Sequence, residues 1–351
     1  MKSVQATGIS SVKEHVACYL RCIVAEYGSD SRSNDDLVAL NPSWSSEGIL
    51  TKVGIGQRRI AAPGETALDI GERAASRLLA EVGHRDGIDV LVFVSQSPDY
   101  LLPSSACMLQ HRLGLSDRVA AFDVGLGCSG FNYALWLGRS LVLAGQAERV
   151  LLVCAETYSR YCGPHDIATV TLFGDGAAAV LLQADPTDTI ATIGDSVLGT
   201  DGSGAEDLMV KAFGARSRAA DPSAPPQSPI LSMDGPSVFR FALDRVRPSC
   251  ERLLEKLALS WDDIGVVLCH QANQFMLNAL QKQLKLDDSR MPIDVRDIGN
   301  LSTASLPVHI ARAYNAGRLD HVTHSLAVGF GVGLSWGATH ILWHVKGAPT
   351  A

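Results

Sequence analysis

The sequence predicts an α/β fold with largely buried sheets. Short apolar runs alternate along the chain with segments of helical periodicity. Several of these runs are apolar at nearly every position, which is typical of strands covered on both faces. The expected strands span residues 89–95, 149–155, 176–182, 266–269 and 325–330, and the expected helices span residues 67–82, 105–115, 131–143 and 237–257.

The organisation along the chain suggests two related halves. At 351 residues the chain is long enough for two domains or two fused halves. Each half contains a helix, a buried strand, a polar turn and a closing glycine-rich strand. We therefore expect an N-terminal half of residues 1–190 and a C-terminal half of residues 191–351. The Ala/Ser/Gly/Pro-rich segment 201–229 predicts a surface loop between them.

The composition excludes several classes of protein. The net charge is −7 and no lysine or arginine run occurs, which argues against a nucleic-acid partner. No stretch of 18 apolar residues predicts a membrane span, and the amino terminus lacks the apolar core of a signal peptide. We expect a cytoplasmic protein whose eight cysteines are reduced and which holds no metal.

The first candidate functional residue is Cys128. It follows a strand-like run that ends in Gly125 and Gly127, and a long apolar helical pattern begins directly after it. A thiol at the amino end of a buried helix meets unpaired N–H groups and the positive end of the helix dipole. Cys128 is therefore a candidate nucleophile, although an apolar core cysteine gives the same local pattern.

Two further segments place polar residues at similar junctions. His270 and Asn273 follow the buried strand 266–269, and Asn300 lies in a Gly/Ser-rich turn before a helical segment. A histidine after a strand is also common as a structural residue. A cysteine, a histidine and an asparagine at three such junctions are more specific for nucleophilic catalysis, provided that the fold brings them together.

Two competing motifs lack their required context. The segment 333–337 fits the Gly-x-Ser-x-Gly elbow of serine hydrolases, but no acidic residue follows it. The segment 125–130 fits the Gly-x-Gly-x-x-Gly dinucleotide fingerprint, but no acidic residue ends a second strand about twenty residues later. Neither serine hydrolysis nor nucleotide binding is favoured.

With these motifs in view, the chain resembles the β-ketoacyl-acyl-carrier-protein synthase III family of thiolase-fold condensing enzymes. The resemblance runs over nearly the whole chain and keeps the order of the motifs. Its segments are 53–60 (VGIGQRRI), 102–107 (LPSSAC), the Cys128 turn, 172–177 (LFGDGA), 270–273 (HQAN), 299–300 (GN) and 329–337 (GFGVGLSWG).

The resemblance implies a five-layered αβαβα thiolase-like fold with the active site where the halves meet. It assigns the nucleophile to Cys128, and the donors that stabilise an enolate to His270 and Asn300. The backbone N–H groups of Cys128 and Gly333 would form the oxyanion hole for the acylated cysteine. Asn273 would orient His270.

The chain also departs from the family pattern around the expected substrate entrance. Lys52 stands where the family often has arginine, and Ile167 and Phe275 occupy places where arginines tend to occur. These changes weaken the expected contacts with coenzyme A, which suggests either a donor bound to a carrier protein or a different way of binding coenzyme A. Leu102 replaces a phenylalanine that caps the partner's acyl pocket, which suggests a donor longer than acetyl, or only a packing residue at a dimer interface.

The resulting prediction is a homodimeric acyltransferase that loads an acyl group onto Cys128. It would then condense that group with malonyl carried on acyl carrier protein, releasing carbon dioxide. The setting would be fatty-acid initiation or a specialised lipid or secondary-metabolite pathway. No cofactor is expected beyond thioester substrates on coenzyme A or carrier protein. The alternatives are acyl transfer to an oxygen or nitrogen nucleophile, and a non-catalytic subunit of a heterodimer.

Overall fold

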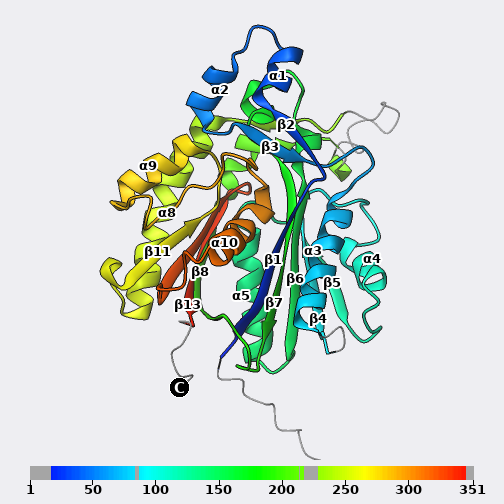
Figure 1. The fold of residues 1–351 in the computed structure, drawn as a ribbon, viewed down its shortest axis with the longest axis vertical. Coiled ribbons are helices and arrows are strands. Elements are labelled where there is room, and N and C mark those ends of the chain that lie inside the picture. The colour runs from blue at the N-terminus through cyan, green and yellow to red at the C-terminus, as the bar shows by residue number, and fades with distance from the viewer. Residues whose placement is uncertain (1–16, 84–86, 213, 217–227, 345–351) are drawn as a thin grey trace, which may run out of the picture.

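The computed structural model describes residues 17–83, 87–212, 214–216 and 228–344. Nine strands form one sheet in the order β11-β12-β13-β8-β1-β7-β6-β4-β5 (Figure 1). These strands are β1 (Tyr19–Tyr27), β4 (Val90–Val94), β5 (Ala120–Val124), β6 (Arg149–Thr157), β7 (Asp175–Gln183), β8 (Ala191–Thr200), β11 (Ile264–Cys269), β12 (His324–Gly331) and β13 (Ser335–Trp343).

Shorter ribbons and helices surround this sheet. The ribbons pair β2 (Asp30–Ser33) with β3 (Gln57–Ile60), and β9 (Leu208–Val210) with β10 (Leu231–Met233). The helices are α1 (Asn34–Leu40), α2 (Ser46–Val53), α3 (Ala67–Val82), α4 (Ser105–Arg112), α5 (Gly130–Leu143), α6 (Ile167–Val170), α8 (Gly235–Leu257), α9 (Gln274–Leu284) and α10 (Ser305–Asn315).

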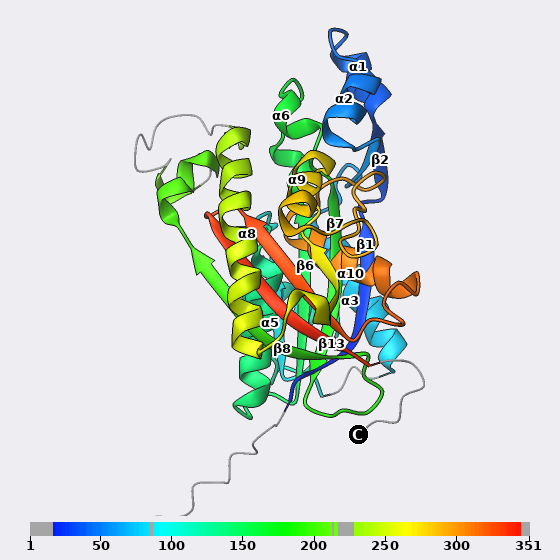
Figure 2. The same ribbon diagram turned by 90° about the vertical axis from the view of Figure 1, so that its left-hand side faces the viewer.

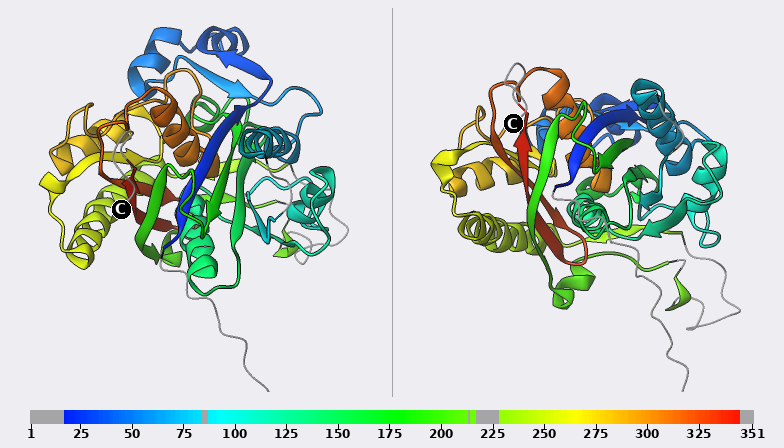
Figure 3. Two further views of the ribbon diagram at one scale, coloured as in Figure 1. Left: turned by 60° about the horizontal axis from the view of Figure 1, so that its bottom comes forward. Right: turned by 90° about the horizontal axis from the view of Figure 1, so that it is seen from below.

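The sheet consists of two parts joined by a narrow seam. Strand β1 pairs with β8 at only two positions, Tyr19 with Thr192 and Leu20 with Ala191. Helices α5 and α10 contact both parts, whereas α3 and α4 cover the outer face of the five-stranded part. Helix α8, with α9 beside it, covers the other part (Figure 2). The layers are therefore α3 with α4, the five-stranded part, α5 with α10, the four-stranded part, and α8 with α9, as the further views in Figure 3 show. This order confirms the predicted five-layered αβαβα arrangement.

The local sequence explains these elements. Strands β4 and β7 are buried at every position, as their continuous apolar runs predict, because helices cover both faces. Helix α3 begins with a capping box between Thr66 and Asp69, and it ends at Gly83, whose φ of +75° is in the left-handed region. Among the described residues, no helix combines the length and apolarity needed to cross a membrane.

The predicted surface loop at 201–229 is only partly correct. A 3₁₀ turn (Gly202–Asp207) and strand β9 lie inside it, and residues 213 and 217–227 are outside the described ranges. Strand β9 forms there because Leu208 is buried opposite β10. The predicted boundary between residues 190 and 191 falls between β7 and β8, and the division into halves stays a prediction.

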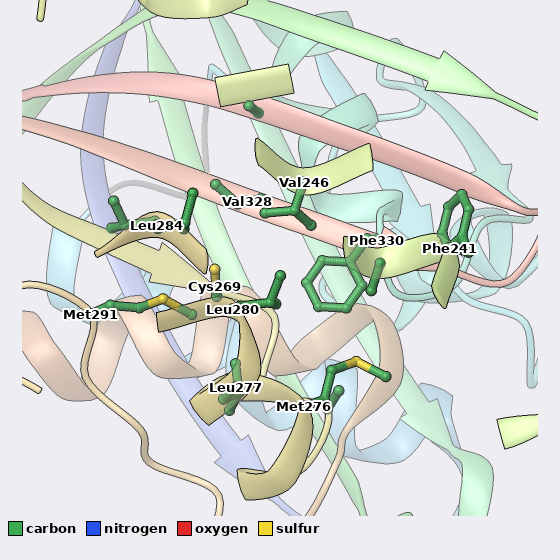
Figure 4. Close-up of a cluster of buried hydrophobic side chains, with 14 of the residues drawn as sticks. Phe241, Val246, Cys269, Met276, Leu277, Leu280, Leu284, Met291, Val328 and Phe330 are labelled. Atoms are coloured by element: carbon green, nitrogen blue, oxygen red, sulfur yellow. The ribbon is translucent and has the colours of Figure 1, made fainter. Parts of the chain in front are cut away.

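A hydrophobic cluster between α8, α9 and the ends of β11 and β12 supports one side of the site. Figure 4 shows Phe330 of β12 among Phe241, Met276 and Leu280 in this cluster. The ring of Phe330 also meets the ring of His270 edge-on, with centroids 5.6 Å apart and an interplanar angle of 84°. The packed core therefore determines where His270 can lie.

Candidate active site

Cys128 lies between β5 and the first turn of α5 and is 4% exposed. The turn before it is close-packed: a Cβ added at Gly127 would lie 2.4 Å from Gln96 Oε1 and 2.5 Å from Val332 Cγ1. Only glycine fits there, because a larger residue would push the nucleophile turn away from its neighbours. The thiol thus occupies the predicted place before a buried helix.

The resting state of the thiol differs from the expectation. Burial raises the pKa of Cys128 to about 11, and hydrogen bonds from the Ser302 side chain and the Val332 backbone oppose that rise without cancelling it. Desolvation outweighs the stabilisation expected from the helix terminus. At neutral pH the nucleophile is therefore a protonated thiol, and it must lose its proton as it attacks.

His270 directly follows β11 and is 1% exposed. Its backbone N–H donates to the carbonyl of Val328 at 2.7 Å, which fixes the residue against β12. Burial lowers the pKa of His270 to about 3, so the imidazole is neutral at physiological pH. Its Nδ1 atom is buried without a partner among the described residues. The surroundings therefore favour the tautomer with its proton on Nε2, which leaves no buried N–H unpaired.

The structure gives Asn273 a different role from the predicted one. Asn273 is the N-cap of α9, and its side-chain oxygen accepts the N–H of Met276 at 2.9 Å. It does not bond to His270 Nδ1, because that atom has no partner in the described part of the chain. The prediction that Asn273 orients His270 is wrong: an asparagine before a helix satisfies the unpaired N–H groups of the first turn.

Asn300 is 5% exposed and is held by three backbone-directed hydrogen bonds. Its N–H donates to the carbonyl of Leu172 at 2.9 Å, and its carbonyl accepts the N–H of Gly174 at 2.9 Å. Its side-chain oxygen accepts the N–H of Ser302 at 2.9 Å. Because the oxygen is occupied, the amide NH₂ is the group of Asn300 that remains to donate to a substrate.

The three predicted residues converge on the end of β12. A Cβ added at Gly331 would lie 2.7 Å from Cys128 Cβ and 2.8 Å from its Sγ, so this strand end touches the nucleophile. His270 is bonded to Val328 of the same strand. Ser302, bonded to Asn300, places its hydroxyl oxygen 3.9 Å from Cys128 Sγ. Strand β12 and the Asn300 turn thus bring together residues from three distant segments.

The oxyanion-hole assignment to Gly333 stays a prediction, and the structure offers Val332 as a second candidate. The amide that contributes a hydrogen bond at Cys128 is that of Val332, one residue earlier. Gly333, with a φ of +143°, already belongs to the turn that leads into β13. Its neighbour in space is Ser335, whose backbone N lies 3.0 Å from an added Cβ. Glycine is therefore required at 333 for the turn, and Val332 faces the thiol.

Sequence reasoning missed a buried carboxyl next to the site. Glu156, near the end of β6, is fully buried and accepts hydrogen bonds from Ser97 Oγ at 2.5 Å, Gln96 N at 3.1 Å and Ser95 Oγ at 3.3 Å. Burial raises its pKa to about 8. The only sequence signal was an acid inside an apolar run, where a charged residue is rarely buried without hydrogen-bond partners.

A cavity of about 520 Å³ is lined in part by Val332, the residue whose backbone forms a hydrogen bond at Cys128. Gln96 lines this cavity and also contacts the turn that carries the nucleophile. Its side-chain oxygen accepts a hydrogen bond from the Tyr158 hydroxyl at 3.0 Å and lies next to Gly127. The remaining wall is mostly apolar. It comprises Pro98, Asp99, Tyr100, Leu101, Tyr161, Leu208, Met209, Val210, Ala212, Gly214 and Leu231. A cavity of this size and lining suits an acyl chain.

The predicted entrance and gate residues lie on the surface and not in this cavity. Leu102 is 82% exposed and is not among the lining residues. Lys52 on α2, Ile167 on α6 and Phe275 on α9 are all exposed. Phe275 packs against Phe239, with ring centroids 5.3 Å apart. Within the described ranges, no group of three or more His, Cys, Asp or Glu side chains could hold a metal ion.

Comparisons with known proteins agree with this arrangement. Residues 122–202 match the profile described as 3-oxoacyl-[acyl-carrier-protein] synthase III, and residues 254–343 match the one described as its C-terminal part. The chain is 35% identical over 302 residues to β-ketoacyl-[acyl-carrier-protein] synthase III of Clostridioides difficile, covering 85% of this chain and 90% of that protein.

Solved structures give the same result over the whole fold. A 2.1 Å crystal structure of a 3-oxoacyl-(acyl-carrier-protein) synthase III superposes with a TM-score of 0.88 at 39% identity, covering 93% of this chain and all of that one. The priming β-ketosynthase of the R1128 polyketide pathway gives a TM-score of 0.85 at 30% identity, covering 96% and 99% of the two chains. The chain therefore belongs to the 3-oxoacyl-[acyl-carrier-protein] synthase III family.

Proposed function

We propose that this protein is a condensing acyltransferase that works through an acyl-Cys128 intermediate. The observation that carries the proposal is the convergence of a buried thiol, a neutral imidazole and an amide NH₂ on the end of β12. A thiol can accept an acyl group from a thioester without a large change in free energy, and the acylated enzyme then awaits a second substrate.

The loading step exchanges one thioester for another. The Cys128 sulfur attacks the donor carbonyl, and the N–H groups of Cys128 and Val332 stabilise the oxyanion that forms. The carrier thiol leaves and takes the proton that Cys128 gave up. The apolar cavity beside Val332 receives the acyl chain, and its volume supports donors longer than acetyl.

The condensing step uses the other two residues. Loss of carbon dioxide from a malonyl thioester held on acyl carrier protein gives an enolate, whose oxygen accepts hydrogen bonds from His270 Nε2–H and the Asn300 NH₂ group. The enolate carbon attacks the acyl-Cys128 carbonyl, a carbon–carbon bond forms, and the Cys128 thiolate leaves. A neutral imidazole suits this role, because it can donate a hydrogen bond without giving up its proton.

The surface of the chain supports a homodimer. Tyr100, Leu101 and Leu102 are consecutive and 59%, 68% and 82% exposed, and Phe122 is 36% exposed on β5, the edge strand. An apolar strip beside an unpaired strand edge is the kind of surface that a second subunit covers. In such a dimer Leu102 would reach the partner's cavity. Light scattering should give twice the 37.3 kDa chain mass.

The donor is proposed to be bound to a carrier protein. Ile167 and Phe275 leave the expected entrance with two exposed apolar residues, and Lys52 supplies one exposed charge. A nucleotide needs firmer polar and stacking contacts than these. Carrier-bound acyl groups should therefore load faster than the matching coenzyme A thioesters. Faster loading from coenzyme A would refute this choice of donor.

The direct test of the reaction is to follow carbon dioxide release and product together. The protein receives an acyl donor and malonyl-acyl carrier protein, and the expected product is the 3-oxoacyl chain formed with one carbon dioxide. Product formed by acyl transfer to an oxygen or nitrogen nucleophile, with no carbon dioxide, would contradict the condensation. Absence of both loading and product would indicate a non-catalytic subunit.

A further inference from the structure

Ser302 is a fully buried residue that touches both sides of the site. Its hydroxyl oxygen lies 3.9 Å from Cys128 Sγ, and this is the one side-chain hydrogen bond recorded for that sulfur in the described part of the chain. Its backbone N–H donates to Asn300 Oδ1 at 2.9 Å. One residue therefore joins the nucleophile to the amide expected to bind the enolate.

The backbone of Ser302 is held in an uncommon conformation. Its φ is +50°, in the left-handed region that residues with a Cβ adopt at a cost in free energy. Glycine or asparagine would be the usual choice for such a position. The bond to Asn300 and the 3₁₀ turn Ser302–Ala304 that follows hold this conformation, and it aims the hydroxyl at the thiol.

We propose that Ser302 is a further catalytic residue, whose hydroxyl donates a hydrogen bond to the Cys128 sulfur when that sulfur carries negative charge. The inference rests on the proposed function of Cys128 as the nucleophile. Negative charge develops on this sulfur twice, when the thiol loses its proton to attack the donor and when the thiolate leaves after condensation. A donated hydrogen bond is stronger to a charged acceptor than to a neutral one, so the contact stabilises these states selectively.

Val332 donates its backbone N–H at the same thiol, so the Ser302 hydroxyl is the side-chain donor there. Glu156, near the end of β6, is a carboxyl that raises the pKa of Cys128, as a smaller cause than burial. The Tyr158 hydroxyl donates to Gln96 Oε1 at 3.0 Å. Within the described part of the chain, no hydrogen bond joins the His270 ring to the Cys128 sulfur, and the ring carries no positive charge. Burial is the main cause that raises the pKa of Cys128, and the Ser302 hydroxyl is the largest influence that lowers it.

The test compares Ser302→Ala and Ser302→Gly by the pH dependence of Cys128 alkylation with iodoacetamide. Both variants lack the hydroxyl and keep the backbone N–H that bonds to Asn300. Alanine retains a Cβ at positive φ, whereas glycine relieves that strain and remains foldable if alanine is not. Peptide mass spectrometry reads Cys128 separately from exposed Cys107. The matched control is Ser305→Ala, a buried serine whose hydroxyl donates instead to the carbonyl of Gln271 at 3.3 Å.

Both Ser302 variants should alkylate about threefold to tenfold more slowly than wild type at every pH on the rising part of the profile. Loss of the hydroxyl should raise the pKa of Cys128 and so lower the fraction of thiolate at each pH. A more basic thiolate is also intrinsically more reactive, and this offsets part of the slowing. The Ser305→Ala profile should equal that of wild type. An unchanged profile in Ser302→Gly, or equal slowing in Ser305→Ala, would overturn the proposal. If Cys128 alkylates as expected but never accepts an acyl group, the proposed function fails and the role of Ser302 toward the thiolate stands.

Discussion

The side-chain oxygen of Asn300 accepts the backbone N–H of Ser302 at 2.9 Å, which fixes the direction of the Asn300 amide. The amide is anchored through its acceptor and keeps its donor for a substrate. The same short turn places a hydroxyl against the Cys128 thiol. In the proposed reaction the two steps therefore use different groups: the sulfur takes the acyl group, and the amide NH₂ binds the enolate.

Replacing the amide donor should affect only the second step. Asn300→Asp keeps an oxygen that can accept the Ser302 N–H, but it removes the NH₂ group and adds negative charge beside an enolate. We expect condensation to slow by about 10²-fold or more, and acyl loading to change by no more than about threefold. Carbon dioxide release measures the first rate and intact mass the second. Equal loss of both rates would show that Asn300 does not act selectively on the enolate.

Because its pKa is low, His270 should contribute no ionisation near neutral pH to the pH dependence of condensation. Because burial lowers the pKa to about 3, the ring stays neutral from pH 5 to pH 8, and condensation should show no ionisation near pH 6.5. Nitrogen-15 NMR of the ring should show constant shifts over the same range. In the unfolded chain His270 binds a proton below pH 6.5, whereas in the folded chain it does so only near pH 3. The contribution of His270 to the free energy of unfolding therefore falls as the pH drops from 6.5 toward 3. A ring titration near 6.5 in the folded protein would contradict the burial of His270.

Gly331 should tolerate no side chain. An added Cβ would lie 2.7 Å from Cys128 Cβ and 2.8 Å from Sγ, and the φ of +154° is also unfavourable for other residues. We expect Gly331→Ala to destabilise the fold by about 1–3 kcal/mol and to abolish acyl loading, because either the strand or the nucleophile must shift. Gly83→Ala is a useful comparison, since its added Cβ meets nothing within 4 Å although its φ is also positive. Loading by Gly331→Ala at the wild-type rate would show that this contact is not restrictive.

Glu156 should make stability depend on pH. Its pKa is raised by burial from 4.5 to about 8, so between these values the unfolded chain releases a proton that the folded chain retains. The stabilising contribution is greatest below pH 4.5 and is lost as the pH rises toward 8, by about 1.4 kcal/mol per pH unit. Urea unfolding of wild type and Glu156→Gln at several pH values isolates this contribution as a difference. A constant difference across the window would contradict the raised pKa.

The sequence allowed most of the fold and the central residues to be predicted, because both depend on local patterns. Continuous apolar runs identified β4 and β7, and junctions between apolar segments and polar turns identified Cys128, His270 and Asn300. A strand that ends at a buried site leaves such a signature in any sequence.

The features that were missed depend on contacts between distant segments. Glu156 is buried because the 95–97 turn supplies its donors, and no pattern around Glu156 reveals that turn. The positive φ of Ser302 is likewise set by its surroundings and not by its residue type. Whether the amide of Val332 or that of Gly333 faces the thiol depends on the exact path of the chain after β12, which motif matching resolves only to within a residue.

The central claim is that Cys128 carries the acyl group, and intact-protein mass spectrometry tests it most directly. Wild type, Cys128→Ala and Cys107→Ala are incubated with acyl-carrier and acyl-coenzyme A thioesters of graded chain length. We predict one acyl mass on wild type and on Cys107→Ala, located to the Cys128 peptide, and none on Cys128→Ala. An acyl mass of equal yield on Cys128→Ala, or its location on another cysteine, would contradict the account.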